Sequence, residues 1–223
     1  MPHFIALTPA MKDDLVQNHV PENKITIIPN GVSIPAQTAP VEKNSHFLYI
    51  GNFSQTAAHK AFDVLLEAWT AFHHHRPAPR LLLLGGGDAE PWQALARQLG
   101  CADSVDFLGY QTSLTPFFTQ SCCLLLPSRK EGIANALLEA QSWGIPAIVS
   151  DIPGNRAVVA HQKNGLIVPV GDSKALAEAM LHLHDSPELR KEYSAAARKR
   201  MEDVFALDKV ADQTVVLYQQ LAG

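Results

Sequence analysis

Short, continuous apolar runs alternate along the chain with longer stretches in which apolar residues recur every three or four positions. A continuous apolar run of this length is typical of a strand that is buried on both faces, as in a parallel sheet. The runs that predict strands are 4–7, 25–28, 47–50, 81–84, 105–108, 123–126, 147–149 and 166–168.

The stretches between these runs have the periodicity of helices. Apolar residues at 62, 65, 66, 69 and 72 follow the spacing of an amphipathic helix that packs on a sheet. Similar stretches cover 92–99, 137–143 and 176–183, and after Pro187 the pattern becomes helical throughout, at 188–203 and 210–221. Because parallel neighbours need a connection that returns over the sheet face, this alternation predicts an α/β fold with a doubly wound, Rossmann-like parallel sheet.

The composition changes near Asn30 and Gly31, where the chain turns to proline and small polar residues that are typical of a linker. Residues 1–33 contain one predicted strand, one helix and a second strand, which is too little to bury a core. We therefore interpret 1–33 as the remnant of a preceding domain with its linker, and 34–223 as one Rossmann-like domain with C-terminal helices.

Composition and charge narrow the function classes. The chain is 47% hydrophobic and 18% charged, as in ordinary globular proteins, and its net charge of -4 supplies no basic surplus for nucleic acid. No apolar run approaches the ~18 residues of a membrane-spanning helix. The three cysteines form no C-x-x-C pair and the first residues, MPHFIALTPA, lack a secretory signal, which together predict a cytoplasmic protein.

The most informative stretch for chemistry runs from Pro127 to Asp151, from the end of a predicted strand through a loop into a helix. Glu131 precedes the helix, Asn135 is the expected N-cap, and Glu139 falls about one turn inside. The loop residues 132–134 offer backbone N–H groups at a helix N-terminus, which attracts phosphate. An anion could therefore lie between two carboxylates that bind hydroxyls, at the sheet edge where open α/β folds hold ligands.

This stretch, E-G-I-A-N-A-L-L-E-A followed by G-I-P-A-I-V-S-D, resembles the E-x7-E signature of retaining glycosyltransferases with the GT-B fold, specifically group 1, or GT4. The resemblance continues in I-I-P-N-G-V at 27–32, F-L-Y-I-G-N-F at 47–53 and K-A-F-D-V-L-L-E-A-W at 60–69. It also includes L-L-L-L-G-G-G-D, V-D-F-L-G-Y and N-G-L-I-V-P, in family order. It thus covers nearly the whole chain and implies the C-terminal, nucleotide-sugar-binding half of a GT-B enzyme.

The resemblance implies roles for individual residues. In the family the first glutamate of the motif contacts donor-sugar hydroxyls, here Glu131, and the second holds the ribose hydroxyls, here Glu139. The phosphate-facing lysine matches Lys60, so Lys60 and Glu131 are the implied catalytic residues. Where the family has an arginine, this chain has Asn52, which can donate a hydrogen bond to phosphate but cannot neutralise the leaving group.

The remaining implied contacts complete a donor-binding set. Gly109 and Tyr110 match the segment whose backbone lies against the nucleobase. The implied donor-binding residues are Asn52, Lys60, Gly109, Tyr110, Glu131, Gly132, Ile133, Ala134, Asn135 and Glu139.

The implied reaction is transfer of a hexosyl group, with retention, from a nucleotide sugar such as a UDP- or GDP-hexose to a carbohydrate or lipid-linked acceptor, as in polysaccharide biosynthesis. We expect no metal and no cofactor, because the chain has no D-x-D metal motif. GT-B enzymes react in a cleft between two domains, so we expect little transfer without the N-terminal acceptor domain. The alternative is a non-catalytic nucleotide-sugar-binding subunit that docks on a separate acceptor-domain partner.

Three further features have simpler interpretations. Gly85, Gly86 and Gly87 lack the rest of a G-x-G-x-x-G pattern, so we expect a tight strand-to-helix turn. Cys122 and Cys123 fall within a predicted strand and are expected to pack in the core. The charged stretch 190–200 mixes signs and predicts a solvated face, with peripheral membrane contact as the alternative.

Overall fold

The computed structural model describes residues 2–222, apart from the side chains of 55–57. The strands are β1 (Phe4–Ala6), β2 (Ile25–Ile27), β3 (His46–Ile50), β4 (Leu81–Leu84), β5 (Val105–Gly109), β6 (Ser121–Leu126), β7 (Ala147–Ser150) and β8 (Gly165–Val168). The α-helices are α1 (Pro9–Gln17), α2 (Phe62–His75), α3 (Glu90–Leu99), α4 (Thr115–Phe118), α5 (Asn135–Ser142), α6 (Pro153–Val158), α7 (Ser173–His184), α8 (Pro187–Arg200) and α9 (Leu207–Ala222). Each predicted strand is confirmed, with ends that agree to within two residues.

The larger sheet confirms the predicted fold class. Its strands are all parallel and lie in the order β5-β4-β3-β6-β7-β8. The chain thus builds outward from β3 through β4 to β5, then crosses back to the other side of β3 and continues outward through β6, β7 and β8. This is the doubly wound order in which the strand sequence reverses once, here between β3 and β6.

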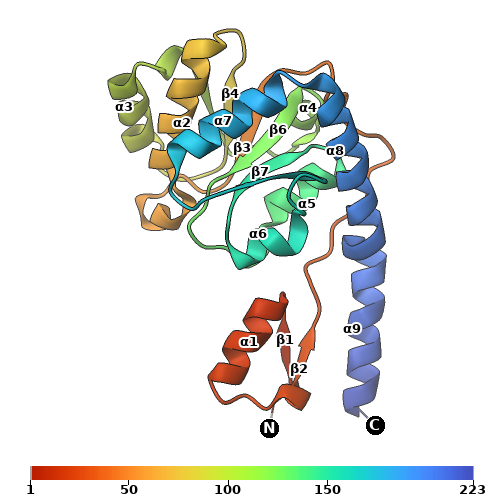
Figure 1. The fold of residues 1–223 in the computed structure, drawn as a ribbon. Helices are drawn as coiled ribbons and strands as arrows, with labels where there is room; N and C mark the ends of the chain where they lie inside the picture. The colour runs from red at the N-terminus through yellow and green to blue at the C-terminus, as the bar shows by residue number, and fades with distance from the viewer. Residues whose placement is uncertain (1, 223) are drawn as a thin grey trace.

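Helices cover both faces of this sheet. Helices α2, α3 and α7 pack beside one another on one face, α5 and α6 lie on the other, and α8 contacts both α5 and α7 (Figure 1). The core is deepest where Phe47 of β3 meets Trp69 and Phe72 of α2 in edge-on ring contacts. Cys122 and Cys123 are fully buried in β6, which confirms their packing role, and burial raises the pKa of the Cys122 thiol to about 12.

The N-terminal residues form a small unit of their own, in which β1 and β2 pair as a two-stranded parallel sheet beside α1. The hydroxyl of Thr8 accepts a hydrogen bond from the backbone N–H of Met11 at 3.1 Å and so caps α1, whose first residue is a proline. Helix α9 runs back from the main sheet to this unit (Figure 1), and Val210 and Leu217 of α9 bury Ile28 just after β2. The domain division at 33 and 34 stays a prediction.

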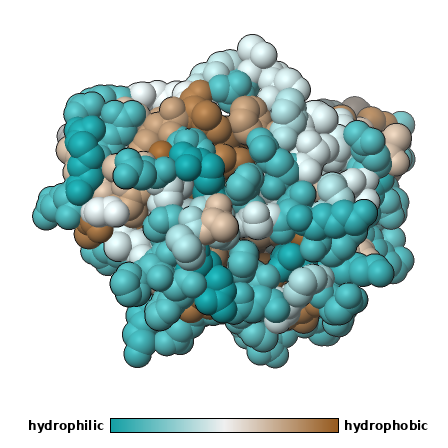
Figure 2. All heavy atoms as spheres, turned by 90° about the horizontal axis from the view of Figure 1, so that it is seen from above, coloured by the Kyte–Doolittle hydropathy of each residue, from teal (hydrophilic) through white to brown (hydrophobic). Residues whose placement is uncertain are grey.

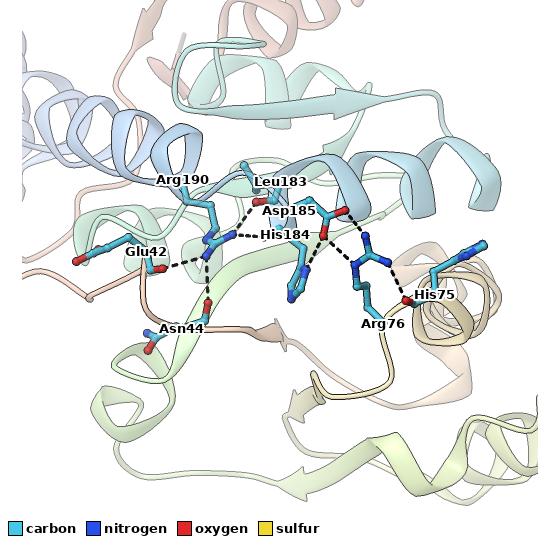
Figure 3. Close-up of polar contacts among 8 residues, drawn as sticks. All are labelled: Glu42, Asn44, His75, Arg76, Leu183, His184, Asp185 and Arg190. Carbon is cyan, nitrogen blue, oxygen red and sulfur yellow. Dashed lines mark hydrogen bonds and ion pairs between the residues drawn. The ribbon is translucent and has the colours of Figure 1, made fainter.

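The stretch 190–200 is not simply a solvated face, and that prediction is wrong for its arginines. Arg190 is only 4% exposed, and Figure 3 shows its guanidinium between the segment before β3 and the junction of α7 and α8. It donates hydrogen bonds to the backbone carbonyls of Val41, Glu42, Asn44, Leu183 and His184. Sequence patterning missed this because a charged side chain can satisfy buried carbonyls that only the tertiary fold brings together.

Two further arginines of this stretch also bind carbonyls of the main sheet's connections. Arg198 donates to the carbonyls of Ser142 and Pro35 at 2.7 and 2.6 Å. Arg200 donates to those of Val158 and Ala157, both at 2.7 Å. These three arginines bind main-chain carbonyls within the protein, and peripheral membrane contact by the stretch stays a prediction from the sequence.

Figure 2 shows one face of the molecule, seen from above. Hydrophilic side chains cover most of that face, and hydrophobic ones show only in separate areas. In residues 2–222 we find no helix long and apolar enough to span a membrane.

Arg190→Met should lower the free energy of unfolding by about 3 kcal/mol, because several buried carbonyls lose their donor while the apolar stem is retained. The measurement is urea unfolding followed by circular dichroism. Arg97→Met is the control, since Arg97 lies 57% exposed in an ion pair with Glu90 and such pairs contribute at most ~1 kcal/mol. Equal losses in the two variants would contradict the role assigned to Arg190.

Candidate functional site

The site lies where the strand order reverses. Strands β3 and β6 are hydrogen-bonded neighbours whose connections leave in opposite directions. Parallel strands that diverge in this way leave a crevice outside their carboxyl ends, which is where open α/β sheets bind ligands. Asn52 and Lys60 follow β3, and Glu131 follows β6, so the topology brings together residues that are far apart in the sequence.

Lys60 and Glu131 meet in this crevice as an ion pair, with 2.5 Å between Nζ and Oε1. Their side chains are only 18% and 12% exposed, so the pair is largely removed from water. The hydroxyl of Ser128 donates to the same carboxylate oxygen at 2.9 Å and orients it. Sequence analysis places Glu131 after a strand and implies Lys60 through the family resemblance alone. It assigns no role here to Ser128, because a serine after a strand carries no pattern of its own.

A second set of contacts ties the loop after β6 to the loop after β3. The backbone N–H of Arg129 donates to the carbonyl of His59 at 2.6 Å. The guanidinium of Arg129 binds both carboxylate oxygens of Asp63, at 3.0 and 2.6 Å, and lowers the pKa of that carboxyl. These bonds fix the loop that carries Lys60 against the loop that carries Glu131.

The glycines at the ends of β3, β4 and β5 form a continuous edge. The N–H of Gly51 donates to the carbonyl of Leu84, and the N–H of Gly85 donates to that of Gly109, both at 2.9 Å. A Cβ atom at Gly85, whose φ is +153°, would lie 1.7 Å from the carbonyl oxygen of Gly51. Only glycine allows the two turns to approach so closely, which confirms the expected tight turn after β4.

Asn52 and Tyr110 lie at opposite ends of this edge. Asn52 is exposed, and its side-chain oxygen accepts a hydrogen bond from the N–H of Ser54 at 2.7 Å, which shapes the loop after β3. Tyr110 follows β5 and is 78% exposed. Asn52 therefore lies at the carboxyl end of β3, near the crevice, whereas Tyr110 lies exposed to solvent at the carboxyl end of β5.

Tyr49 of β3 lies beneath the same turn. Its hydroxyl is fully buried, and among the described residues it has no hydrogen-bond partner. A Cβ atom at Gly51 would lie 2.4 Å from that hydroxyl, so the turn crosses directly over it. Burial, and then the nearby Glu131 carboxylate, raise the pKa of Tyr49 above the ordinary value of a tyrosine.

The loop between the two glutamates ends in α5, and here one prediction is wrong. The N-cap is Ala134, whose extended backbone precedes the helix and whose carbonyl accepts the first helical hydrogen bonds. Asn135 is the first helical residue instead, and its side-chain oxygen accepts a hydrogen bond from Asn30 at 3.0 Å. The side chain that would have capped the helix is therefore used in a contact over long sequence distance.

The backbone of this loop is packed from one side and open on the other. Ile133 is buried, whereas Gly132 is exposed. A Cβ atom at Gly154 in α6 would lie 1.6 Å from the carbonyl oxygen of Gly132, so the start of α6 supports the loop at backbone contact. A Cβ atom at Gly132 itself would make only an ordinary contact with Leu7.

Glu139 lies one turn into α5, as predicted. Within the part of the chain that the structure describes, its half-buried carboxylate has no hydrogen bond or ion pair, and burial raises its pKa above the ordinary glutamate value of 4.5. It lines a cavity of about 580 Å³ together with residues of the segments 31–35 and 112–115. Sequence analysis missed the second segment, although its T-S-L-T sequence just after β5 offers three hydroxyls.

Glu131 lines a second cavity, also of about 580 Å³, on the other side of the loop. This cavity is lined by Met11 and Asp14 of α1, by His59 after β3, and by Lys130 and Gly132 after β6. The two cavities are lined by different parts of the stretch that joins the glutamates, with Glu131 in one and Glu139 in the other.

The described residues bring together no group of three or more histidine, cysteine, aspartate or glutamate side chains that could hold a metal ion. Among the groups that could meet an anion are Lys60 and the backbone N–H groups at the start of α5. Whether catalysis needs a metal stays a prediction from the sequence.

Known proteins resemble this chain over most of its length. The family described as Glycosyl transferases group 1 matches residues 44–186. An uncharacterised glycosyltransferase of Haemophilus influenzae is 26% identical over 94% of this chain and 59% of its own length. The lipopolysaccharide core biosynthesis glycosyltransferase LpsD of Rhizobium meliloti is 30% identical over 63% of this chain and 41% of its own length.

A solved structure shares the fold. Anabaena HepE, crystallised with UDP and glucose, superposes with a TM-score of 0.84 at 18% identity, over 96% of this chain and 62% of that one. The chain thus spans only 41% to 62% of the lengths of these three proteins. Its fold is that of the Rossmann-like half of a GT-B glycosyltransferase, and the chain belongs to the group 1 glycosyl transferases.

Proposed function

We propose that this chain forms the donor site of a glycosyltransferase that moves a hexosyl group from a nucleotide sugar to a carbohydrate or lipid-linked acceptor. The observation that carries the proposal is the pairing of Lys60 with Glu131 at the strand-order reversal, together with the unpaired Glu139 one turn into the helix that follows Glu131. A cation and two carboxylates suit a ligand that has a diphosphate between two polyhydroxylated groups.

In this proposal the nucleoside occupies the Glu139 cavity. An unpaired carboxylate can accept hydrogen bonds from both ribose hydroxyls, which restores the solvation that it lost on burial. Gly109 and Tyr110 lie at the end of β5, just before the 112–115 segment of the same cavity, and would meet the base. This geometry does not determine which nucleobase is bound.

The diphosphate would lie along the loop, where Lys60 and the N–H groups of 132–134 face it, with Asn52 as a neutral donor. Glu131 would then bind hydroxyls of the sugar. In the reaction the bond from the anomeric carbon to the diphosphate breaks, and the leaving oxygen keeps the electron pair. A bond forms from the anomeric carbon to the acceptor oxygen, whose proton passes to the leaving diphosphate. Fixed charges and dipoles stabilise the leaving group without reorganisation, so we propose that no metal is needed. We propose retention because the stretch from Glu131 to Glu139 resembles the motif of retaining enzymes.

The names of the related proteins support this class of reaction. HepE was crystallised with UDP and glucose, and LpsD acts in lipopolysaccharide core biosynthesis. Because the chain spans only 62% of HepE and 41% of LpsD, we propose that transfer also needs an acceptor domain. The exposed apolar side chains that such a domain would cover are Ile5, Ile27, Leu207, Val215, Val216, Tyr218 and Leu221.

The same exposed surface favours one alternative, a non-catalytic nucleotide-sugar-binding subunit on a separate acceptor-domain partner. The two functions differ in whether the acceptor domain, added back, restores transfer by this site. In both, the chain binds a nucleotide, so nucleotide binding is the first property to measure.

Lys60→Met should weaken binding of the preferred nucleoside diphosphate by at least tenfold, or ~1.4 kcal/mol, because it removes the cation that faces the phosphates. The measurement is calorimetric titration with UDP, GDP and ADP and their glucose and mannose conjugates. Lys191→Met is the matched control, since Lys191 is exposed on α8. The proposal would be contradicted if the unmodified chain bound none of these nucleotides, or if both variants lost the same affinity.

Glu139→Gln should raise stability and weaken nucleotide binding at neutral pH. Because burial raises the pKa of Glu139 in the folded state, the stabilising contribution of its protonated form is present below pH 4.5 and lost as the pH rises through the folded pKa. The free energy of unfolding of the variant should therefore exceed that of the unmodified chain at pH 7, and the difference should vanish below pH 4.5.

The same variant should lose about tenfold or more in nucleotide affinity, equivalent to ~1.4 kcal/mol. Urea unfolding between pH 4 and 8 and calorimetric titration at pH 7 measure the two effects. Glu192→Gln on the exposed face of α8 is the control and should change neither. A variant that gains stability but binds nucleotide normally would show that Glu139 is not a donor-binding residue.

A further inference from the structure

Asn30 joins two parts of the chain that the sequence keeps far apart. Its single side-chain amide donates one hydrogen bond to the backbone carbonyl of Ile133 at 3.3 Å and one to the side-chain oxygen of Asn135 at 3.0 Å. Both acceptors belong to the loop and helix start between Glu131 and Glu139. We infer that Asn30 is a positioning residue that fixes this loop to the connecting segment, residues 28–33, and so couples donor binding to the placement of the N-terminal unit.

The connecting segment is held at both ends. On one side, the N–H of Ile28 donates to the carbonyl of Ala6 at 3.0 Å, which continues the pairing of β2 with β1. On the other side, Val32 forms two backbone hydrogen bonds with the chain at the start of α9. Its N–H donates to the carbonyl of Phe205 at 2.8 Å, and its carbonyl accepts from the N–H of Leu207 at 3.0 Å. Asn30 lies between these two attachments.

The loop depends on this contact because the helix start at its end lacks a side-chain cap. The N-cap of α5, Ala134, has no side chain that could bind the free N–H groups of the first turn. Asn135, the residue that could have capped the helix one position earlier, accepts from Asn30 instead. The orientation of the first turn of α5 is therefore set from outside the helix.

The Glu139 cavity is lined by residues next to Asn30 in the chain and by one of its partners. Gly31, Val32 and Ser33 line it, and so does Asn135, which accepts a hydrogen bond from Asn30. A displacement of the connecting segment would therefore move the loop and reshape the cavity together. If the bound shape becomes only a fraction of the population, the apparent affinity falls by that fraction.

This inference rests on the proposed function, because the coupling matters only if the cavity binds a nucleotide. We expect Asn30→Ala to weaken binding of the best nucleoside diphosphate, among UDP, GDP and ADP, by about five- to tenfold. In the free chain it should also speed hydrogen–deuterium exchange of the backbone amides of 132–138 by about tenfold. Exchange in β3 and β6 should change only as much as the loss of overall stability requires.

Asn44→Ala is the matched control. The side-chain amide of Asn44 also donates to two carbonyls, those of Thr119 and Ser121, at 2.9 and 3.1 Å. These acceptors lie at the amino end of β6, at the opposite end of the strand from the site. Asn44→Ala should therefore lower stability to a similar degree, but leave nucleotide affinity and exchange in 132–138 unchanged.

A second pair of variants keeps the test decisive if Asn30→Ala folds poorly. Asn135→Ala removes one acceptor without changing the connecting segment, and it should reproduce part of the faster exchange in 132–138. In the Asn30→Ala background it should add little, because the shared contact is already lost. Full additivity of the two changes would overturn the coupling.

The outcomes distinguish a failure of the proposed function from a failure of the role assigned to Asn30. If the unmodified chain binds none of the three nucleotides, the proposed function fails, while the exchange rates still decide whether Asn30 holds the loop. If the unmodified chain binds a nucleotide and Asn30→Ala behaves like Asn44→Ala in both measurements, the proposed function stands and the role of Asn30 is refuted.

Discussion

The reversal of strand order between β3 and β6 is the constraint on which the site depends. Two parallel strands that are bonded to each other send their connections over opposite faces, so the backbone parts at their carboxyl ends. Lys60 and Glu131 meet in that opening at 2.5 Å, although 70 residues of helix and strand lie between them in the sequence. Neither side chain would be so well shielded from water beside a strand pair whose connections run over the same face.

The surroundings of the site combine rigid support with groups that the fold leaves unsatisfied. Arg129 binds Asp63 with two hydrogen bonds, and Gly154 supports the loop at backbone contact. In contrast, the Glu139 carboxylate and the Tyr49 hydroxyl lose water without gaining a partner among the described residues. Buried polar groups are normally hydrogen-bonded. Tyr49 is sealed beneath the turn at Gly51, whereas Glu139 lines a cavity, so Glu139 is the group whose missing hydrogen bonds a ligand could supply.

Polar side chains hold together segments that are distant in sequence, by hydrogen bonds that the apolar core does not provide. Arg190, Arg198 and Arg200 bind carbonyls of segments that precede the helices carrying them by many residues. Asn30 does the same for the loop before α5. In each case the acceptors are main-chain carbonyls or amide oxygens left free by irregular backbone, and the donors lie at elements that pack there only in the folded protein.

The sequence by itself determined the strands, the helices and the parallel, doubly wound fold, because the spacing of apolar residues reflects local burial directly. It also placed Glu131 after a strand and Glu139 within the helix that follows, whereas Lys60 was implied by the family resemblance. Only the tertiary structure decided that Asn135 accepts from Asn30 rather than capping α5, that Ser128 orients Glu131, and that Arg190 is buried. These outcomes depend on which carbonyls and side chains meet across long sequence distances, and no local pattern of residue types encodes such a meeting.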